Sequence, residues 1–142
     1  MSLNVVFNSS EPYLNLLDAA KVAHEQNQHK ESVILAQTSL ELFTEKVLGR
    51  LYTVRNIEYL KPEFEHLLIN YNLVNSKVSG LYIALSGDEI KQESFWADLV
   101  DHTELRNALV HEGKDATIDQ SSRSLAAVNA LIAHVIKFNN IQ

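Results

Sequence analysis

The chain has 142 residues, of which 46% are hydrophobic, and it carries a formal net charge of −6 at pH 7. This length and this hydrophobic fraction predict one globular domain, residues 1–142, with a single core. The absence of cysteine excludes a disulfide scaffold, a thiolate metal site and a cysteine nucleophile, and the acidic charge disfavours non-specific binding to long nucleic acid.

The sequence predicts a cytoplasmic protein that does not cross a membrane. No apolar run approaches the length needed to span a bilayer, and the first residues lack the basic and apolar regions of a signal peptide. Four glycines and two prolines leave few breaks, which favours long helices over many short strands.

The first two predicted helices carry apolar residues at helical spacing. Residues 9–12 hold two candidate capping serines, an acid and a proline, which predict a helix from there to about Gln26. A polar connector at residues 27–30 leads to a second helix, which reaches about Tyr52 and is expected to be the central helix of a bundle. Its buried face is expected to comprise Val33, Ala36, Leu40, Phe43, Val47 and Leu51, widened by Ile34, Leu35, Leu42 and Leu48.

Two shorter helices are predicted in the middle of the chain. Pro62 predicts a helix start at the end of a break over residues 56–62. Apolar residues between 78 and 85 predict another short helix, which ends at Gly87. Residues 89–94 are polar and are interpreted as a loop or a helix entry.

A long helix and a final helix complete the prediction. The helix over residues 94–111 is stopped by Gly113, and the last helix is expected to be capped by Asp119 or Ser121. The buried face of that last helix is expected to comprise Leu125, Val128, Leu131, Ile132, Val135 and Ile136. No β-alternation and no internal repeat are found, so the predicted fold is an all-α, up-and-down helical bundle of about five or six helices.

Metal binding, serine catalysis and phosphate-loop binding have no sequence signature here. The six histidines are scattered and no His-Glu-x-x-His motif occurs. Asp98, Asp101, His102 and Glu104 form a local cluster, whose carboxylates are interpreted as a solvated helix face. The four glycines are too far apart for a phosphate-binding loop, and no nucleophile-elbow motif is present. We therefore expect no metal site and no cofactor.

Arg106 is unusual because it falls in the middle of an apolar stripe. At about 100° per residue, Phe95, Leu99, Leu109 and Val110 gather on one side of the predicted helix, around Arg106. An arginine rarely occupies such a place unless it has a partner or faces a cavity. This position marks Arg106 as a candidate site residue.

Arg106 and His111 permit a structural and a functional interpretation. In the first, His111 binds the last helix carbonyls, and Arg106 snorkels or pairs with Glu41 or Glu45 of the long helix. In the second, the histidine transfers protons and the guanidinium fork binds a phosphate, as phosphodiester cleavage requires. RNA supplies its own 2′-hydroxyl nucleophile. Because residues five apart point about 140° away from each other on a helix, two copies in a symmetric dimer belong to this interpretation.

The segment ELRNALVHEG, residues 104–113, resembles the signature of HEPN domains. That signature is an arginine, usually followed by a polar residue such as asparagine, and a histidine after four to six intervening positions. Here four residues separate Arg106 from His111, and Asn107 supplies the polar residue. The helix at residues 32–43 also resembles the second helix of that family, and the helix order covers most of the chain.

The resemblance implies an all-α bundle, usually dimeric, in which two Arg-His motifs face each other. Many members are metal-independent endoribonucleases in toxin, phage-defence or RNA-processing systems, whereas others are inactive binding or dimerisation modules. Carried over to this chain, Arg106 binds and stabilises the phosphate, His111 performs the acid–base chemistry, and Asn107 positions one or both.

One position departs from part of that family. Toxins that pair with a small nucleotidyltransferase antitoxin commonly carry a tyrosine where this chain has Gly113, which argues against that antitoxin type. The ending at residues 110–113 is more similar to Apea-like HEPN domains. Lys114 is a candidate contact to RNA, with Arg123 and Lys91 as weaker ones.

Two functional hypotheses follow from the sequence. The first is a homodimeric, metal-independent endoribonuclease of HEPN type. The alternative is a non-catalytic module that dimerises or binds a nucleotide or a partner protein.

Overall fold

The computed structural model describes residues 11–141, which form six α-helices and two short 3-10 helices and contain no strand. The α-helices are α2 (Pro12–Glu25), α3 (His29–Val54), α4 (Lys61–Leu67), α5 (Ser76–Ser86), α6 (Trp96–Glu112) and α7 (Ile118–Phe138). The 3-10 helices are η1 (Glu58–Leu60) and η2 (Ile90–Gln92). The predicted all-α helical bundle is confirmed. Within the described residues, no helix has both the length and the apolar character that crossing a bilayer requires.

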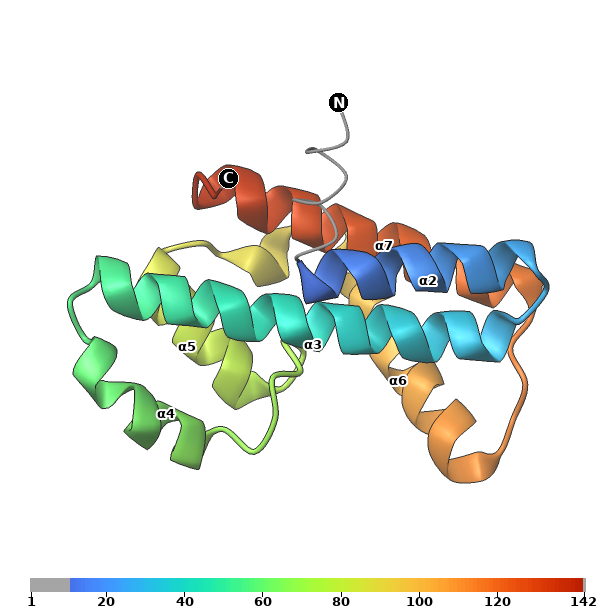
Figure 1. Ribbon diagram of the computed structural model, residues 1–142, viewed down its shortest axis with the longest axis horizontal. Helices are drawn as coiled ribbons and strands as arrows, with labels where there is room; N and C mark the ends of the chain where they lie inside the picture. Colours follow the sequence, from blue (N-terminus) through green and yellow to red (C-terminus); the bar gives the residue numbers. More distant parts are fainter. Residues whose placement is uncertain (1–10, 142) are drawn as a thin grey trace.

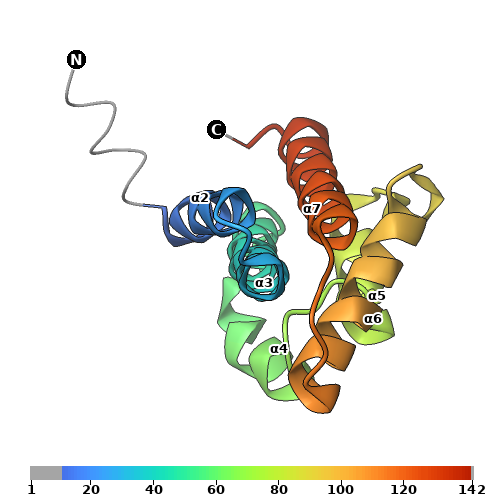
Figure 2. The same ribbon diagram turned by 90° about the vertical axis from the view of Figure 1, so that its right-hand side faces the viewer.

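The helices are arranged around α3, which lies in the middle of the bundle (Figures 1 and 2). Figure 1 shows α2 and α3 as an antiparallel pair, α7 returning in the direction of α3, and α6 crossing them obliquely. Figure 2 shows α3 between α2 on one side and α5, α6 and α7 on the other. The carboxyl end of α6 projects away from α2, α3 and α7, toward the side on which α4 lies (Figures 1 and 2). The candidate site residues therefore lie on a helix end that is only partly covered by its neighbours.

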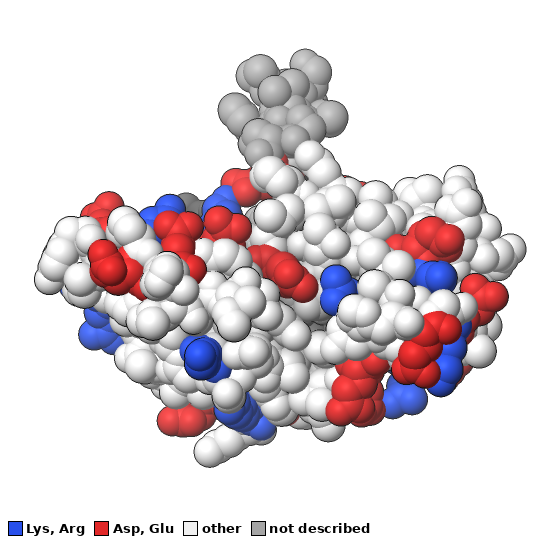
Figure 3. Space-filling view, turned by 90° about the horizontal axis from the view of Figure 1, so that it is seen from below, with Lys and Arg blue, Asp and Glu red and all other residues white. Residues whose placement is uncertain are grey.

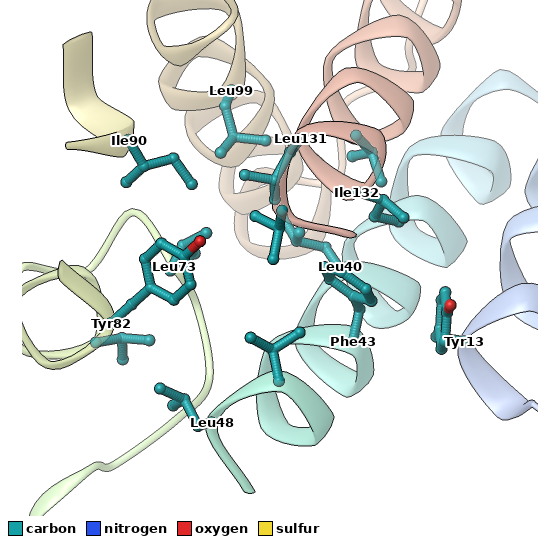
Figure 4. Packing of buried hydrophobic residues seen from close by; sticks show 14 of the residues in the cluster. Tyr13, Leu40, Phe43, Leu48, Leu73, Tyr82, Ile90, Leu99, Leu131 and Ile132 are labelled. Atoms are coloured by element: carbon teal, nitrogen blue, oxygen red, sulfur yellow. The ribbon is translucent and has the colours of Figure 1, made fainter. Parts of the chain in front are cut away.

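The core forms where the apolar stripes of α3 and α7 meet. All six residues of the main stripe predicted for α3 are buried, which confirms the helical periodicity of that segment. Figure 4 shows Leu40 and Phe43 of α3 directed toward Leu131 and Ile132 of α7, with Leu99 of α6 nearby. Each such side chain, when fully buried, contributes about 1.5–3 kcal/mol to stability relative to full exposure.

Two apolar residues that the periodicity placed in the core are exposed instead. Leu42 is 36% exposed, at the rim of a cavity of about 400 Å³ beside Pro12 and Lys46. Val110 is 45% exposed, because the end of α6 projects beyond the helices that cover Leu99 and the rest of its buried face. The spacing of apolar residues along one helix does not show how far the neighbouring helices extend, and therefore does not show which of these residues they bury.

The N-cap of α7 lies two residues before the first of the two predicted capping residues and four before the second. Thr117, rather than Asp119 or Ser121, is the N-cap: its hydroxyl accepts the Gln120 N–H at 3.1 Å, and the Gln120 side chain accepts the Thr117 N–H at 2.9 Å. This reciprocal pair satisfies two donors at the helix start. At α2 the N-cap is Glu11, without a side-chain capping bond, and the predicted serine caps at residues 9 and 10 lie outside the described residues.

Gly113 ends α6 as predicted, in a left-handed conformation with φ +67°. We expect Gly113→Ala to lower the free energy of unfolding by about 1 kcal/mol, because a Cβ strains this conformation. An added Cβ meets no atom within 4 Å, so crowding does not contribute. Gly80→Ala is the matched control, because Gly80 lies inside α5 and an added Cβ there also meets no atom within 4 Å. This substitution is expected to raise the free energy of unfolding by about 0.5–1 kcal/mol, since alanine favours a helix interior over glycine. Urea denaturation measures both, and equal effects would contradict the backbone explanation.

Candidate functional site

The last turns of α6 carry the three central residues that the sequence singled out. Arg106, Asn107 and His111 lie on this one helix, which ends at Glu112 before the turn at Gly113. The side chains of Asn107 and His111 are exposed, whereas that of Arg106 is half-buried. The prediction that Arg106 lies on the buried stripe is thus correct, although the stripe is open at this end.

Arg106 has no carboxylate partner among residues 11–141. Its Nη1 donates a hydrogen bond to Asn107 Oδ1 at 3.2 Å, and its Nε is buried without a hydrogen-bond partner. The expected pairing with Glu41 or Glu45 is not formed. Glu41 instead accepts a hydrogen bond from Gln37 Nε2 at 2.8 Å. No carboxylate of the described chain therefore offsets the charge of this half-buried guanidinium.

A buried neutral histidine lies one turn before Arg106. His102 is 2% exposed, and its Nε2 lies 2.9 Å from Gln37 Oε1 of α3. Burial first, and the positive charge of Arg106 second, lower the pKa of His102 from 6.5 to about 4. The carboxylates predicted to form a solvated face, Asp98, Asp101 and Glu104, are exposed as expected, whereas α6 turns the neighbouring His102 toward α3. One feature of the sequence could have indicated that His102 lies next to Arg106: the two residues are four apart, which places them on the same face of a helix.

His111 and Lys114 lie at the exposed end of the site. His111 is in the last turn of α6, where the helix dipole favours a cation. Lys114 Nζ pairs with Glu112 Oε1 at 3.1 Å, and both side chains are more than half exposed. A pair this exposed contributes little to stability and is easily exchanged for another anion.

The other candidate basic residues do not form one basic surface with Arg106. Arg123 Nη2 pairs with Asp98 Oδ1 at 3.3 Å, on the wall of a cavity of about 220 Å³ between α6 and α7. Lys91 is exposed in η2. Figure 3 shows acidic and basic side chains interspersed over the face on which α4 and the end of α6 lie. An RNA contact on this face would therefore depend on single cations rather than on a broad positive area.

Two polar clusters elsewhere in the fold were missed by sequence reasoning. Ser121 Oγ lies 2.6 Å from His24 Nδ1 and 2.9 Å from His29 Nδ1, joining α7 to the turn between α2 and α3. The buried Asp88 accepts hydrogen bonds from Tyr82 and His134. Within the part of the chain that the structure describes, no three histidine, aspartate or glutamate side chains gather closely enough to hold a metal ion.

In the part of the chain that the structure describes, fold and site define an all-α helical bundle in which one helix end carries an arginine without a carboxylate partner, an adjacent asparagine and an exposed histidine. Comparisons of the chain with protein-family models, curated proteins and solved structures give no match. The resemblance to HEPN domains therefore depends on the motif residues and the helix order alone, and the activity it implies stays a prediction.

Proposed function

We propose that this protein is a metal-independent endoribonuclease of HEPN type, with an active site composed across a homodimer. The observation that carries this proposal is the guanidinium of Arg106, which is half-buried, held by Asn107 and free of any carboxylate in the described chain. A structural arginine in an apolar stripe normally has an anionic partner. An unpaired one is suited to bind an anion that arrives from outside, such as an RNA phosphate.

The proposed chemistry needs only the substrate and two kinds of side chain. The RNA 2′-oxygen attacks the adjacent phosphorus, and the bond from phosphorus to the 5′-oxygen breaks. His111 of one copy takes the proton of the 2′-hydroxyl, and His111 of the second copy gives a proton to the leaving 5′-oxygen. Arg106 stabilises the charge on the phosphate oxygens. The products carry a 2′,3′-cyclic phosphate and a 5′-hydroxyl.

A second copy is part of the proposal because one helix does not bring the two side chains together. Arg106 and His111 point about 140° apart on α6. Val110 is exposed beside His111 and offers an apolar contact at the same helix end. The resemblance also implies the biological setting, a toxin or phage-defence system. Lys114, a basic residue just past the same helix end, is a further candidate contact to RNA.

We expect the wild-type protein to cleave a labelled, structured RNA in EDTA and to leave 2′,3′-cyclic phosphate ends. Arg106→Ala and His111→Ala are expected to lose at least about 100-fold in rate, since proton transfer alone contributes about 10²–10⁴-fold. His66→Ala, at an exposed histidine of α4, is the matched control and is expected to cut as the wild type does. Circular dichroism and mass measurement check that each variant is folded and dimeric. Wild-type cleavage that survives both site substitutions would refute the proposal.

A second candidate function, a protein-binding module, is favoured by the surface around α4. Tyr59, Leu67 and Ile69 are among the most exposed large hydrophobic side chains, and they lie within 11 residues of sequence. Such a group suits contact with another protein. If the wild type leaves varied RNAs intact while Arg106→Ala and His111→Ala lose stability or dimerisation, this function replaces the first one.

A further inference from the structure

Three buried polar atoms without a hydrogen-bond partner lie within about one turn of α6: His102 Nδ1, Thr103 Oγ1 and Arg106 Nε. Among residues 11–141 the only other such side-chain atom is Tyr52 Oη, on α3. An unsatisfied buried group costs about 1–3 kcal/mol, so a concentration of three at one place requires a reason. One of these atoms belongs to the arginine that carries the proposed function, and the other two lie three and four residues before it on the same helix.

Hydrogen bonds from α3 determine which nitrogen of His102 carries a proton. The Glu41 carboxylate only accepts, so the Gln37 amide must turn its NH₂ group toward Glu41, at 2.8 Å. Its carbonyl oxygen then faces His102, and Nε2 of that ring must donate across the 2.9 Å contact. Because the buried ring is neutral, Nδ1 is left as an acceptor without a donor.

The free acceptor and the free donor are complementary. His102 and Arg106 are four residues apart, so they lie on successive turns of the same face of α6. His102 Nδ1 lacks a donor, and Arg106 Nε–H lacks an acceptor. A rotation of the arginine side chain that brings Nε–H to His102 Nδ1 would satisfy both groups at once.

We propose that His102 is a positioning residue for Arg106, whose Nε–H it accepts through Nδ1 while a phosphate binds the terminal guanidinium nitrogens. Without an anion, Asn107 holds the guanidinium through Nη1. With one bound, the neutral imidazole orients the arginine without cancelling its charge, which a carboxylate at this place would do. The inference rests on the proposed function, because the anion is the phosphate of an RNA.

Titration of ¹⁵N-labelled protein with inorganic phosphate tests this role without any cleavage reaction. We expect NMR spectra of the wild type to show His102 protonated at Nε2 and unprotonated at Nδ1. Phosphate is expected to shift both the Arg106 Nε–H signal and the His102 Nδ1 signal. A proton found on His102 Nδ1, or phosphate that shifts neither signal, would overturn the proposal.

Substitutions separate this role from packing. His102→Leu is expected to weaken phosphate binding about tenfold, in line with the loss of one charge-assisted hydrogen bond. Gln37→Met leaves His102 in place but removes the acceptor that keeps the proton on Nε2, and it is expected to weaken binding in the same direction. Thr103→Val, which removes the neighbouring unpartnered hydroxyl, is the matched control and is expected to bind as the wild type does. Wild-type affinity in both His102→Leu and Gln37→Met would overturn the proposal.

Failure of the ribonuclease proposal is distinguishable from failure of this one. A protein that binds phosphate through Arg106 and His102 but leaves RNA intact retains the positioning role and loses the enzymatic one. If the wild type cleaves RNA, but kcat/KM and phosphate affinity are unchanged in His102→Leu and Gln37→Met, the ribonuclease proposal stands and the positioning role of His102 is refuted.

Discussion

Asp88→Ala is expected to lower the free energy of unfolding by about 3 kcal/mol, because it removes the acceptor at the centre of a buried polar cluster. Asp88 is 2% exposed and accepts hydrogen bonds from Tyr82 Oη at 2.7 Å and from His134 Nε2 at 2.9 Å. Burial, with the hydrogen bond to Asp88 as the next cause, raises the pKa of Tyr82. Alanine would leave the buried phenol with no acceptor for its proton. Chemical denaturation at pH 7 measures the loss.

The matched control uses the second carboxylate next to the same histidine. Glu93 Oε1 lies 3.5 Å from His134 Nδ1, but its side chain is 42% exposed. We expect Glu93→Gln to change stability by less than about 1 kcal/mol, because water screens and replaces such a contact. Equal losses in Asp88→Ala and Glu93→Gln would show that burial does not decide the strength of this cluster.

Lowering the pH from 7 to 4 is expected to destabilise the protein by about 3 kcal/mol through His102 alone. The pKa of His102 is about 4 in the folded protein, against 6.5 for an ordinary histidine. Between these values the unfolded chain binds the extra proton and the folded protein does not. The contribution of His102 to the free energy of unfolding is therefore fully present above about pH 6.5, and it is lost as the pH falls toward 4. Arg106 on α6 is the charged group that lowers the pKa of the ring. Asp98 and Asp101 of α6 and Arg123 of α7 line the same cavity as His102, and Glu41 of α3 lies beyond Gln37.

His102→Gln isolates this contribution from that of the other titrating groups. The variant is less stable than the wild type at pH 7, but its stability is expected to fall by about 3 kcal/mol less on acidification to pH 4. Denaturation curves of both proteins across this range give the difference. His66→Gln, at an exposed histidine of α4, is expected to follow the wild-type curve. Parallel curves for the wild type and His102→Gln would contradict the assignment.

Local patterns in the sequence predicted the helices well, because helix formation depends on neighbouring residues. The stripe from Val33 to Leu51 correctly predicted the buried side of α3, and Gly87 and Gly113 correctly predicted two helix ends. Thr117 and Gln120 also have the spacing of a capping box, so the sequence does contain the signal for the observed cap. The predicted caps, Asp119 and Ser121, lack this spacing to a glutamate or glutamine.

The candidate site was predicted only in part. The position of Arg106 on the apolar stripe identified it, because the stripe is a property of one helix. Its partners could not be inferred in the same way. The expected carboxylate of Glu41 is engaged by Gln37, and exposure at Val110 depends on how far α6 extends past its neighbours.

By itself the sequence determined an all-α bundle, its main helices, and an Arg-Asn-x3-His motif at one helix end. Only the tertiary structure decided that Arg106 has no carboxylate partner within residues 11–141, and that His102, 65 residues from Gln37, is a buried neutral neighbour. The tertiary structure also shows the hydrogen bond from His134 to Asp88, 46 residues away, which the sequence did not predict. The physical reason is that helical periodicity is set within a few residues, whereas side-chain partners depend on the angle and register at which distant helices pack.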